Sequence, residues 1–150
     1  MTKPGFGIEP RDKTGIINQA LDWIGAGHEV SLATVVSTWG SSPRPVGSQL
    51  LIRADKLFQG SVSGGCIEGE VVTEALAAIR NDTVAILDFG VSDEDAWSAG
   101  LACGGQIQVF VQRVSAGLQG VLAELQAGRA ANKAMALLID LETGAASLHE

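Results

Sequence analysis

Apolar side chains recur along the chain with two periods, which predict its helices and its strands. A helical repeat runs through residues 12–27, from near Cys66 to Ile79, and through residues 121–129. A β-branched composition or strict alternation marks the strands. The predicted strands are residues 29–38, 49–53, 57–62, 83–89, 106–114, 134–140 and 145–149.

The strand over residues 106–114 shows the alternation most clearly. Apolar residues at positions 107, 109 and 111 alternate with glutamines at positions 106, 108 and 112. A period of two is typical of a strand with one buried and one solvated face. We therefore expect this strand to be half solvated.

Interleaved helices and strands predict an α/β or α+β domain, in which helices cover a mixed β-sheet and glycine-rich loops join strands to helices. A length of 150 residues suits one domain with a core of its own. We interpret residues 1–150 as a single domain. Its motif-bearing core spans about residues 30–114, and a C-terminal helix and hairpin follow at 118–149.

Glycine is about twice as frequent as in an average protein, at 19 of 150 residues. Glycine permits a positive φ and lets several N–H groups converge on an anion, but it also serves tight turns, so both interpretations stay open. No Lys-Ser or Lys-Thr pair follows the glycines as in a P-loop. Nine glycines lie in or beside three loops: Gly40, Gly47, Gly60, Gly64, Gly65, Gly69, Gly100, Gly104 and Gly105.

The two cysteines each adjoin a pair of glycines. Cys66 follows Gly64-Gly65 at a predicted helix start, where the helix dipole lowers a thiol pKa. The carboxylates of Glu68 and Glu70 oppose this effect. Cys103 stands before a second glycine pair. Each cysteine is either a reactive thiol or a buried apolar residue, and a disulfide between them would act as a redox switch.

The charge pattern disfavours several partners. Seventeen acidic and ten scattered basic side chains give a net charge of −7, which counts against a broad nucleic-acid surface. No run reaches the roughly 18 apolar residues of a membrane span, and residues 1–11 lack the apolar run of a signal peptide, so we expect a cytoplasmic protein. Arg44 lies between two prolines, and an anion-facing role and simple exposure are about equally favoured there.

Other candidate groups carry weaker signals. His28 and His149 stand at no zinc-ligand spacing with the cysteines, so we interpret both as surface residues. The acidic run at residues 93–95 is interpreted as solvated or as the start of a helix, with a metal role as the minority alternative. The three tryptophans are interpreted as core or partner-surface aromatics rather than a stacking platform: Trp23, Trp39 and Trp97.

Three motifs resemble the N-terminal domain of the xanthine dehydrogenase accessory factor family, XdhC/CoxI. They are GSSPRPVG at residues 40–47, GSVSGGCIE at residues 60–68 and GLACGG at residues 100–105. The resemblance implies a chaperone without turnover that binds the molybdenum cofactor, a pterin dithiolene carrying a phosphate. It also implies two partners: a cysteine desulfurase during sulfuration, and the molybdenum hydroxylase, of xanthine dehydrogenase or CO dehydrogenase type, that receives the cofactor.

The resemblance also implies a set of site residues. A phosphate would lie on N–H groups before the helix with Arg44 as counter-charge, while a thiolate of Cys66 or Cys103 would approach molybdenum or carry a persulfide. The implied cofactor-binding residues are Ser41, Ser42, Arg44, Ser63, Gly64, Gly65, Cys66, Glu68, Cys103, Gly104 and Gly105.

Alternatives to the chaperone are a cysteine-persulfide sulfurtransferase and a structural subunit without a ligand. Many members of the family continue into a Rossmann-like domain, and this chain ends at Glu150. We therefore expect no C-terminal Rossmann domain here. A homodimer or a separate Rossmann-domain partner is the expected assembly.

Overall fold

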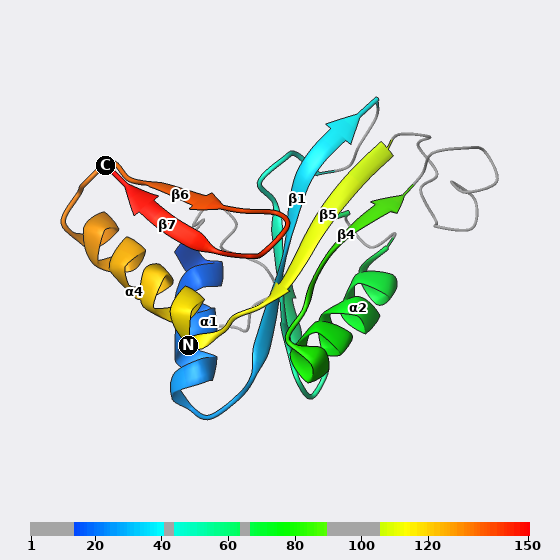
Figure 1. Cartoon of the computed structure of the whole chain (residues 1–150), viewed down its shortest axis with the longest axis horizontal. Helices are drawn as coiled ribbons and strands as arrows, with labels where there is room; N and C mark the ends of the chain where they lie inside the picture. The colour runs from blue at the N-terminus through cyan, green and yellow to red at the C-terminus, as the bar shows by residue number, and fades with distance from the viewer. Residues whose placement is uncertain (1–13, 41–43, 64–66, 90–105) are drawn as a thin grey trace, which may run out of the picture.

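The computed structural model describes residues 14–40, 44–63, 67–89 and 106–150. A five-stranded sheet of order β3-β2-β1-β5-β4 forms its centre (Figure 1). Every pairing between these strands is antiparallel, so of the two expected fold classes the chain has the α+β class. The strands are β1 (Val30–Trp39), β2 (Gln49–Arg53), β3 (Phe58–Gly60), β4 (Val84–Phe89) and β5 (Gln106–Arg113).

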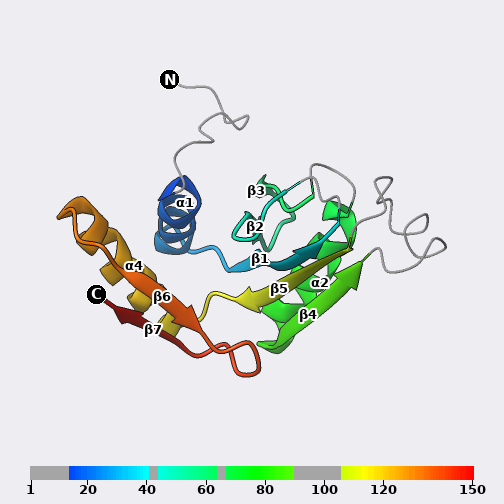
Figure 2. The same cartoon turned by 90° about the horizontal axis from the view of Figure 1, so that it is seen from above.

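Helices cover the sheet, as expected, and they lie on both of its faces. Helix α2 (Glu68–Asn81) packs on one face, where its buried residues join those of the central strands. Helices α1 (Thr14–Gly25) and α4 (Ala116–Ala130) pack against each other over the opposite face (Figure 2). A separate hairpin, β6 (Ala136–Ile139) and β7 (Ala146–His149), contacts α4. The domain therefore has two apolar cores, one on each face of the sheet.

The C-terminal helix is longer than its apolar repeat predicts. It begins at Ala116 rather than near residue 121, because Ser115 caps it: the Ser115 side chain accepts a hydrogen bond of 3.3 Å from the N–H of Leu118. Gly117 and Gly120 weaken the helical signal of this first turn, since glycine disfavours a helix. Buried leucines then anchor the helix over the second core.

The prediction that β5 is half solvated is wrong along most of the strand. Phe110 is buried, and Gln112 is only 4% exposed although it lies among the polar positions. The reason is tertiary: the turn of the β6–β7 hairpin reaches β5, and Gln112 Nε2 donates a hydrogen bond of 3.3 Å to the carbonyl oxygen of Gly144. Only the beginning of β5 keeps one half-exposed, polar face.

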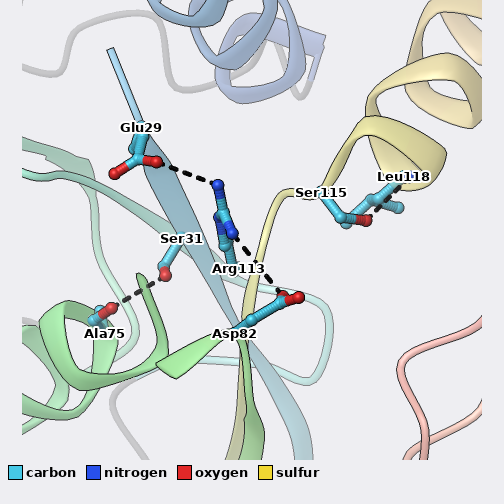
Figure 3. A network of polar contacts seen from close by, with 7 residues as sticks. All are labelled: Glu29, Ser31, Ala75, Asp82, Arg113, Ser115 and Leu118. Carbon is cyan, nitrogen blue, oxygen red and sulfur yellow. Dashed lines mark hydrogen bonds and ion pairs between the residues drawn. The ribbon is translucent and has the colours of Figure 1, made fainter. Parts of the chain in front are cut away.

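A polar network marks the end of the sheet where β1 begins and β5 ends, which we call the lower end (Figure 3). Arg113 pairs with Glu29 at 3.0 Å and lies 4.0 Å from Asp82. The buried Ser31 hydroxyl donates a 2.9 Å hydrogen bond to the carbonyl oxygen of Ala75 in α2. Because Asp82 is the C-cap of α2 and precedes β4, the helix ends and β4 begins at this lower end.

Candidate functional site

The described residues next to the first and third motifs lie together at the opposite, upper end of the sheet. Trp39 ends β1 and pairs with Gln106, which begins β5. Phe89 ends β4 and pairs with Ile107 of β5. The strand register therefore brings together the chain positions that lead into residues 41–43 and 90–105 (Figure 1).

The second motif reaches the same end through helix α2. The helix has 14 residues and thus spans about 21 Å at 1.5 Å per residue. Strand β4 has six residues, which span about 20 Å. Since the helix ends where β4 begins, its first residue, Glu68, lies at the level where β4 ends. One end of each of the three motifs is thus at the upper end of the sheet, marked by Trp39, Glu68 and Gln106.

Glu68 holds the loop between β3 and α2 to the first turn of the helix. Its Oε2 atom accepts hydrogen bonds of 3.0 Å from the Ser61 hydroxyl and from the N–H groups of Val62 and Ser63. Its Oε1 atom accepts a 2.5 Å hydrogen bond from the Ser63 hydroxyl. Ser63 Oγ in turn accepts a 3.0 Å hydrogen bond from the N–H of Ile67. Glu68 and Ser63 are both predicted site residues, but no pattern in the sequence indicates that they bind each other.

These contacts control the charge of Glu68. Burial raises the pKa of this half-buried carboxyl, but the hydrogen bonds from Ser63, Val62 and Ser61 outweigh burial and lower the pKa from 4.5 to about 2. Glu68 is therefore ionised at neutral pH. Its position in the first turn of α2 also suits a negative charge, because the helix dipole is positive there.

Arg44 belongs to a loop that folds back onto β1. The N–H of Gly47 donates a 2.8 Å hydrogen bond to the carbonyl oxygen of Val35. The N–H of Val35 donates a 2.9 Å hydrogen bond to the carbonyl oxygen of Ser48. Gly47 has a φ of 95°, which glycine adopts without strain. Arg44 is exposed just ahead of this anchored turn. The loop therefore presents a cation on the first motif.

Other predicted site residues lie outside the described part of the chain, and their contacts stay predictions. The acidic run at residues 93–95 and Trp97 also lie outside the described part. The site residues concerned are Ser41, Ser42, Gly64, Gly65, Cys66, Cys103, Gly104 and Gly105.

A polar hollow of about 230 Å³, which was not predicted from the sequence, lies at the upper end of the sheet. Trp39, interpreted as a core or partner-surface residue, lines the hollow and is 69% exposed. The sequence feature that could have indicated this hollow is the cluster of polar residues at the strand ends. The lining residues are Ser37, Thr38, Trp39, Asp88, Phe89, Gln106, Ile107 and Gln108.

A β-bulge in β1 turns Trp39 toward this hollow. Val35 pairs with Val109, but the next register pair joins Ser37 to Gln108, so Val36 is the extra residue. Side chains alternate between faces along a regular strand, and a bulge shifts that alternation by one residue. Val35 is buried in the core beneath α2, whereas Ser37 and Trp39 line the hollow on the other face.

Neither a metal centre nor a membrane span is found in the described ranges. Within them, no three histidine, cysteine or acidic side chains group closely enough to hold a metal ion. The helices described there have at most 15 residues, and none has the length and apolar character needed to cross a membrane. His149 is exposed and His28 is half-buried.

This α+β domain thus has an antiparallel sheet, and one end of each of three glycine-containing motifs lies at the upper end of that sheet. Residues 23–90, which carry the first two motifs, match the model of the XdhC and CoxI family. The resemblance stated from the motifs is confirmed.

Named relatives agree with this match. The molybdenum cofactor insertion chaperone PaoD of Escherichia coli is 30% identical over 113 residues, which cover 75% of this chain and 35% of PaoD. A probable xanthine dehydrogenase subunit of Bacillus subtilis is 32% identical over 89 residues, 58% of this chain and 27% of that protein. A crystal structure of a xanthine dehydrogenase from Bacillus halodurans has a TM-score of 0.62 at 27% identity, covering 75% and 35% of the two chains. The chain spans about a third or less of the length of these relatives.

Proposed function

We propose that this chain is part of an accessory protein that binds the molybdenum cofactor and assists its insertion into a molybdenum hydroxylase of xanthine dehydrogenase or CO dehydrogenase type. The main support is the position of the three motifs: Trp39 before the first, Glu68 at the end of the second and Gln106 after the third lie at the upper end of the sheet. Similarity to PaoD, a named insertion chaperone, supports the same role.

The chain's own residues divide into ligand-facing and positioning groups in this proposal. Glu68 and Ser63 are positioning residues, because their polar atoms are used in bonds within the second motif. They hold the backbone on either side of Gly64, Gly65 and Cys66, whose N–H groups would receive the cofactor phosphate. Arg44 would supply the opposite charge.

The thiols carry the sulfur chemistry of the proposal. Cys66 and Cys103 would offer soft ligands to molybdenum while a cysteine desulfurase supplies the terminal sulfur. The protein then protects the cofactor without turnover of its own. We also propose a cytoplasmic location, and an assembly as a homodimer or with a separate Rossmann-domain partner, which the mass of the purified complex would distinguish.

Co-purification tests this function. The chain is produced with its partner hydroxylase in molybdenum-replete cells, and bound pterin and molybdenum are measured. We expect both to accompany the wild-type chain and to be lost from a Cys66→Ser, Cys103→Ser double variant, with Glu70→Gln as the control. A wild-type chain that carries neither pterin nor molybdenum overturns the proposal.

The wild-type chain and the double cysteine variant also distinguish a chaperone from a sulfurtransferase. After incubation with a desulfurase, mass spectrometry reports whether either cysteine gains one sulfur atom. A persulfide that passes to an acceptor in a single turnover would make the chain a sulfurtransferase instead. Full cofactor retention and partner activation by the double variant would remove both thiols from the mechanism.

A further inference from the structure

We propose that the hollow at the upper end of the sheet binds the pyrimidine edge of the cofactor's pterin ring, with Trp39 stacked on the ring. This inference rests on the proposed function and assigns one subsite within it. The hollow lies beside the strand ends that lead into the first and third motifs, because Trp39, Phe89 and Gln106 belong to its lining.

The chemistry of the hollow matches an edge rich in hydrogen-bond donors. Asp88 Oδ1 accepts a 2.7 Å hydrogen bond from Gln108 Nε2, which fixes the carboxylate across two strands. Asp88 Oδ2 has no hydrogen-bond partner among the described residues. The 2-amino group and N3–H of a pterin are adjacent donors, and a carboxylate only accepts. Asp88 therefore suits that pair of donors.

The remaining lining residues suit the rest of the ring. The 4-oxo group is an acceptor, and the Gln106 amide and the Ser37 hydroxyl are donors on the same lining. Trp39 offers a wide aromatic surface, since it is 69% exposed. Flat heterocycles stack on such side chains in many proteins. The β-bulge that turns Trp39 to this face therefore gives the hollow its aromatic wall.

Size and charge set the orientation of the cofactor. A hollow of about 230 Å³ is smaller than the roughly 300–1,000 Å³ of pockets that hold a whole small molecule, so it admits only part of the cofactor. Asp88 is the charged residue of the lining, and a carboxylate repels a phosphate. The phosphate would therefore point away from the hollow, toward the motif that carries Arg44.

Two simple probes test this subsite with the purified full chain. Pterin (2-amino-4-oxopteridine) has the 2-amino donor, whereas lumazine (2,4-dioxopteridine) has a carbonyl oxygen at that position. We expect calorimetry to show about tenfold or more tighter binding of pterin, because lumazine places an acceptor against Asp88. Asp88→Asn should reduce this preference to about threefold or less, since an amide can both donate and accept.

Two matched pairs of variants keep the test specific. Trp39→Ala should weaken both probes by about tenfold, as expected for a lost stacking surface. Phe58→Ala and Asp22→Asn replace an exposed aromatic and an exposed acid elsewhere and should leave binding unchanged. Thermal melting of all four variants checks that they fold.

The outcomes separate this subsite from the proposed function. Equal binding of the two probes, no binding of pterin, or an Asp88→Asn variant that discriminates like wild type overturns the subsite. If the wild-type chain still co-purifies with the cofactor, the proposed function survives that result. If the wild-type chain carries no cofactor, the proposed function fails, whatever the probes show.

Discussion

Ser63 and Glu68 bind each other twice: the Ser63 hydroxyl donates to Glu68 Oε1 at 2.5 Å and the Ser63 N–H donates to Oε2 at 3.0 Å. Ser63 is buried, and its oxygen also accepts from the N–H of Ile67. The loop after β3 and the first turn of α2 are therefore one hydrogen-bonded unit. A unit held by its own contacts spends little binding energy on ordering when a ligand arrives.

Replacing Glu68 with glutamine should destabilise the domain. A glutamine presents an NH₂ group where one carboxylate oxygen accepts bonds, so at least one donor of the loop loses its acceptor. We expect a loss of about 1–3 kcal/mol in the free energy of urea unfolding. Glu70→Gln removes another charge from the same turn but an exposed one, and should cost less than about 1 kcal/mol. Equal losses in the two variants would show that Glu68 contributes only charge.

The same carboxylate should make stability depend on pH in acid. The folded-state pKa of Glu68 is about 2, below its ordinary 4.5, so the folded state gains stability above pH 4.5 and loses it as the pH falls from 4.5 toward 2. Because half of the group is exposed to solvent, we expect the ionised Glu68 side chain to contribute about 1–2 kcal/mol to the free energy of unfolding. The measurement is the difference in unfolding free energy between wild type and Glu68→Gln at several pH values.

This difference isolates Glu68 from other carboxyls. The pKa of Asp55 is also lowered to about 2, chiefly by the hydrogen bonds from the Arg53 side chain, but Asp55 is present in both proteins and its effect cancels. The gap between the two proteins should close as the pH approaches 2. A gap that stays constant from pH 6 to pH 2 would contradict the assigned pKa.

The order of most helices and strands could be predicted from the sequence because their signals are local. The strand over Val84–Phe89 and the hairpin of β6 and β7 were predicted from β-branched composition and a central turn. The burial of Gln112 could not be predicted, because it depends on Gly144, 32 residues further along the chain. Period-two alternation reports one solvated face only when no distant segment covers that face.

The site was predictable only in part for a related reason. Three glycine motifs indicated where a ligand would bind, since unusual glycine density is visible in sequence. The Asp88–Gln108 hydrogen bond joins residues 20 apart on different strands, and no local pattern links them. The orientation of Trp39 depends on a bulge in β1, which shifts side-chain alternation without a glycine to mark it.

Gly60, which begins the second motif, and Gly69, which directly follows it, should respond oppositely to alanine. Gly60 has a φ of 99°, and a Cβ there would overlap the carbonyl oxygen of Gln49, so Gly60→Ala should cost more than about 2 kcal/mol. Gly69 lies in α2 with open space around it, so Gly69→Ala should leave stability unchanged or raise it by up to about 1 kcal/mol. Urea unfolding of both variants checks the pair, and similar losses in both would refute the assigned backbone.

The N-cap of α4 should be worth a measurable part of the domain's stability. Ser115 Oγ accepts a 3.3 Å hydrogen bond from the N–H of Leu118, which otherwise has no partner within the helix. Ser115→Ala should therefore lower the free energy of unfolding by about 0.5–2 kcal/mol, and Ser115→Asp, which also caps helices well, should restore most of it. If alanine and aspartate behave alike in urea unfolding, the helix begins later in the chain, near residue 121, as its apolar repeat alone predicts.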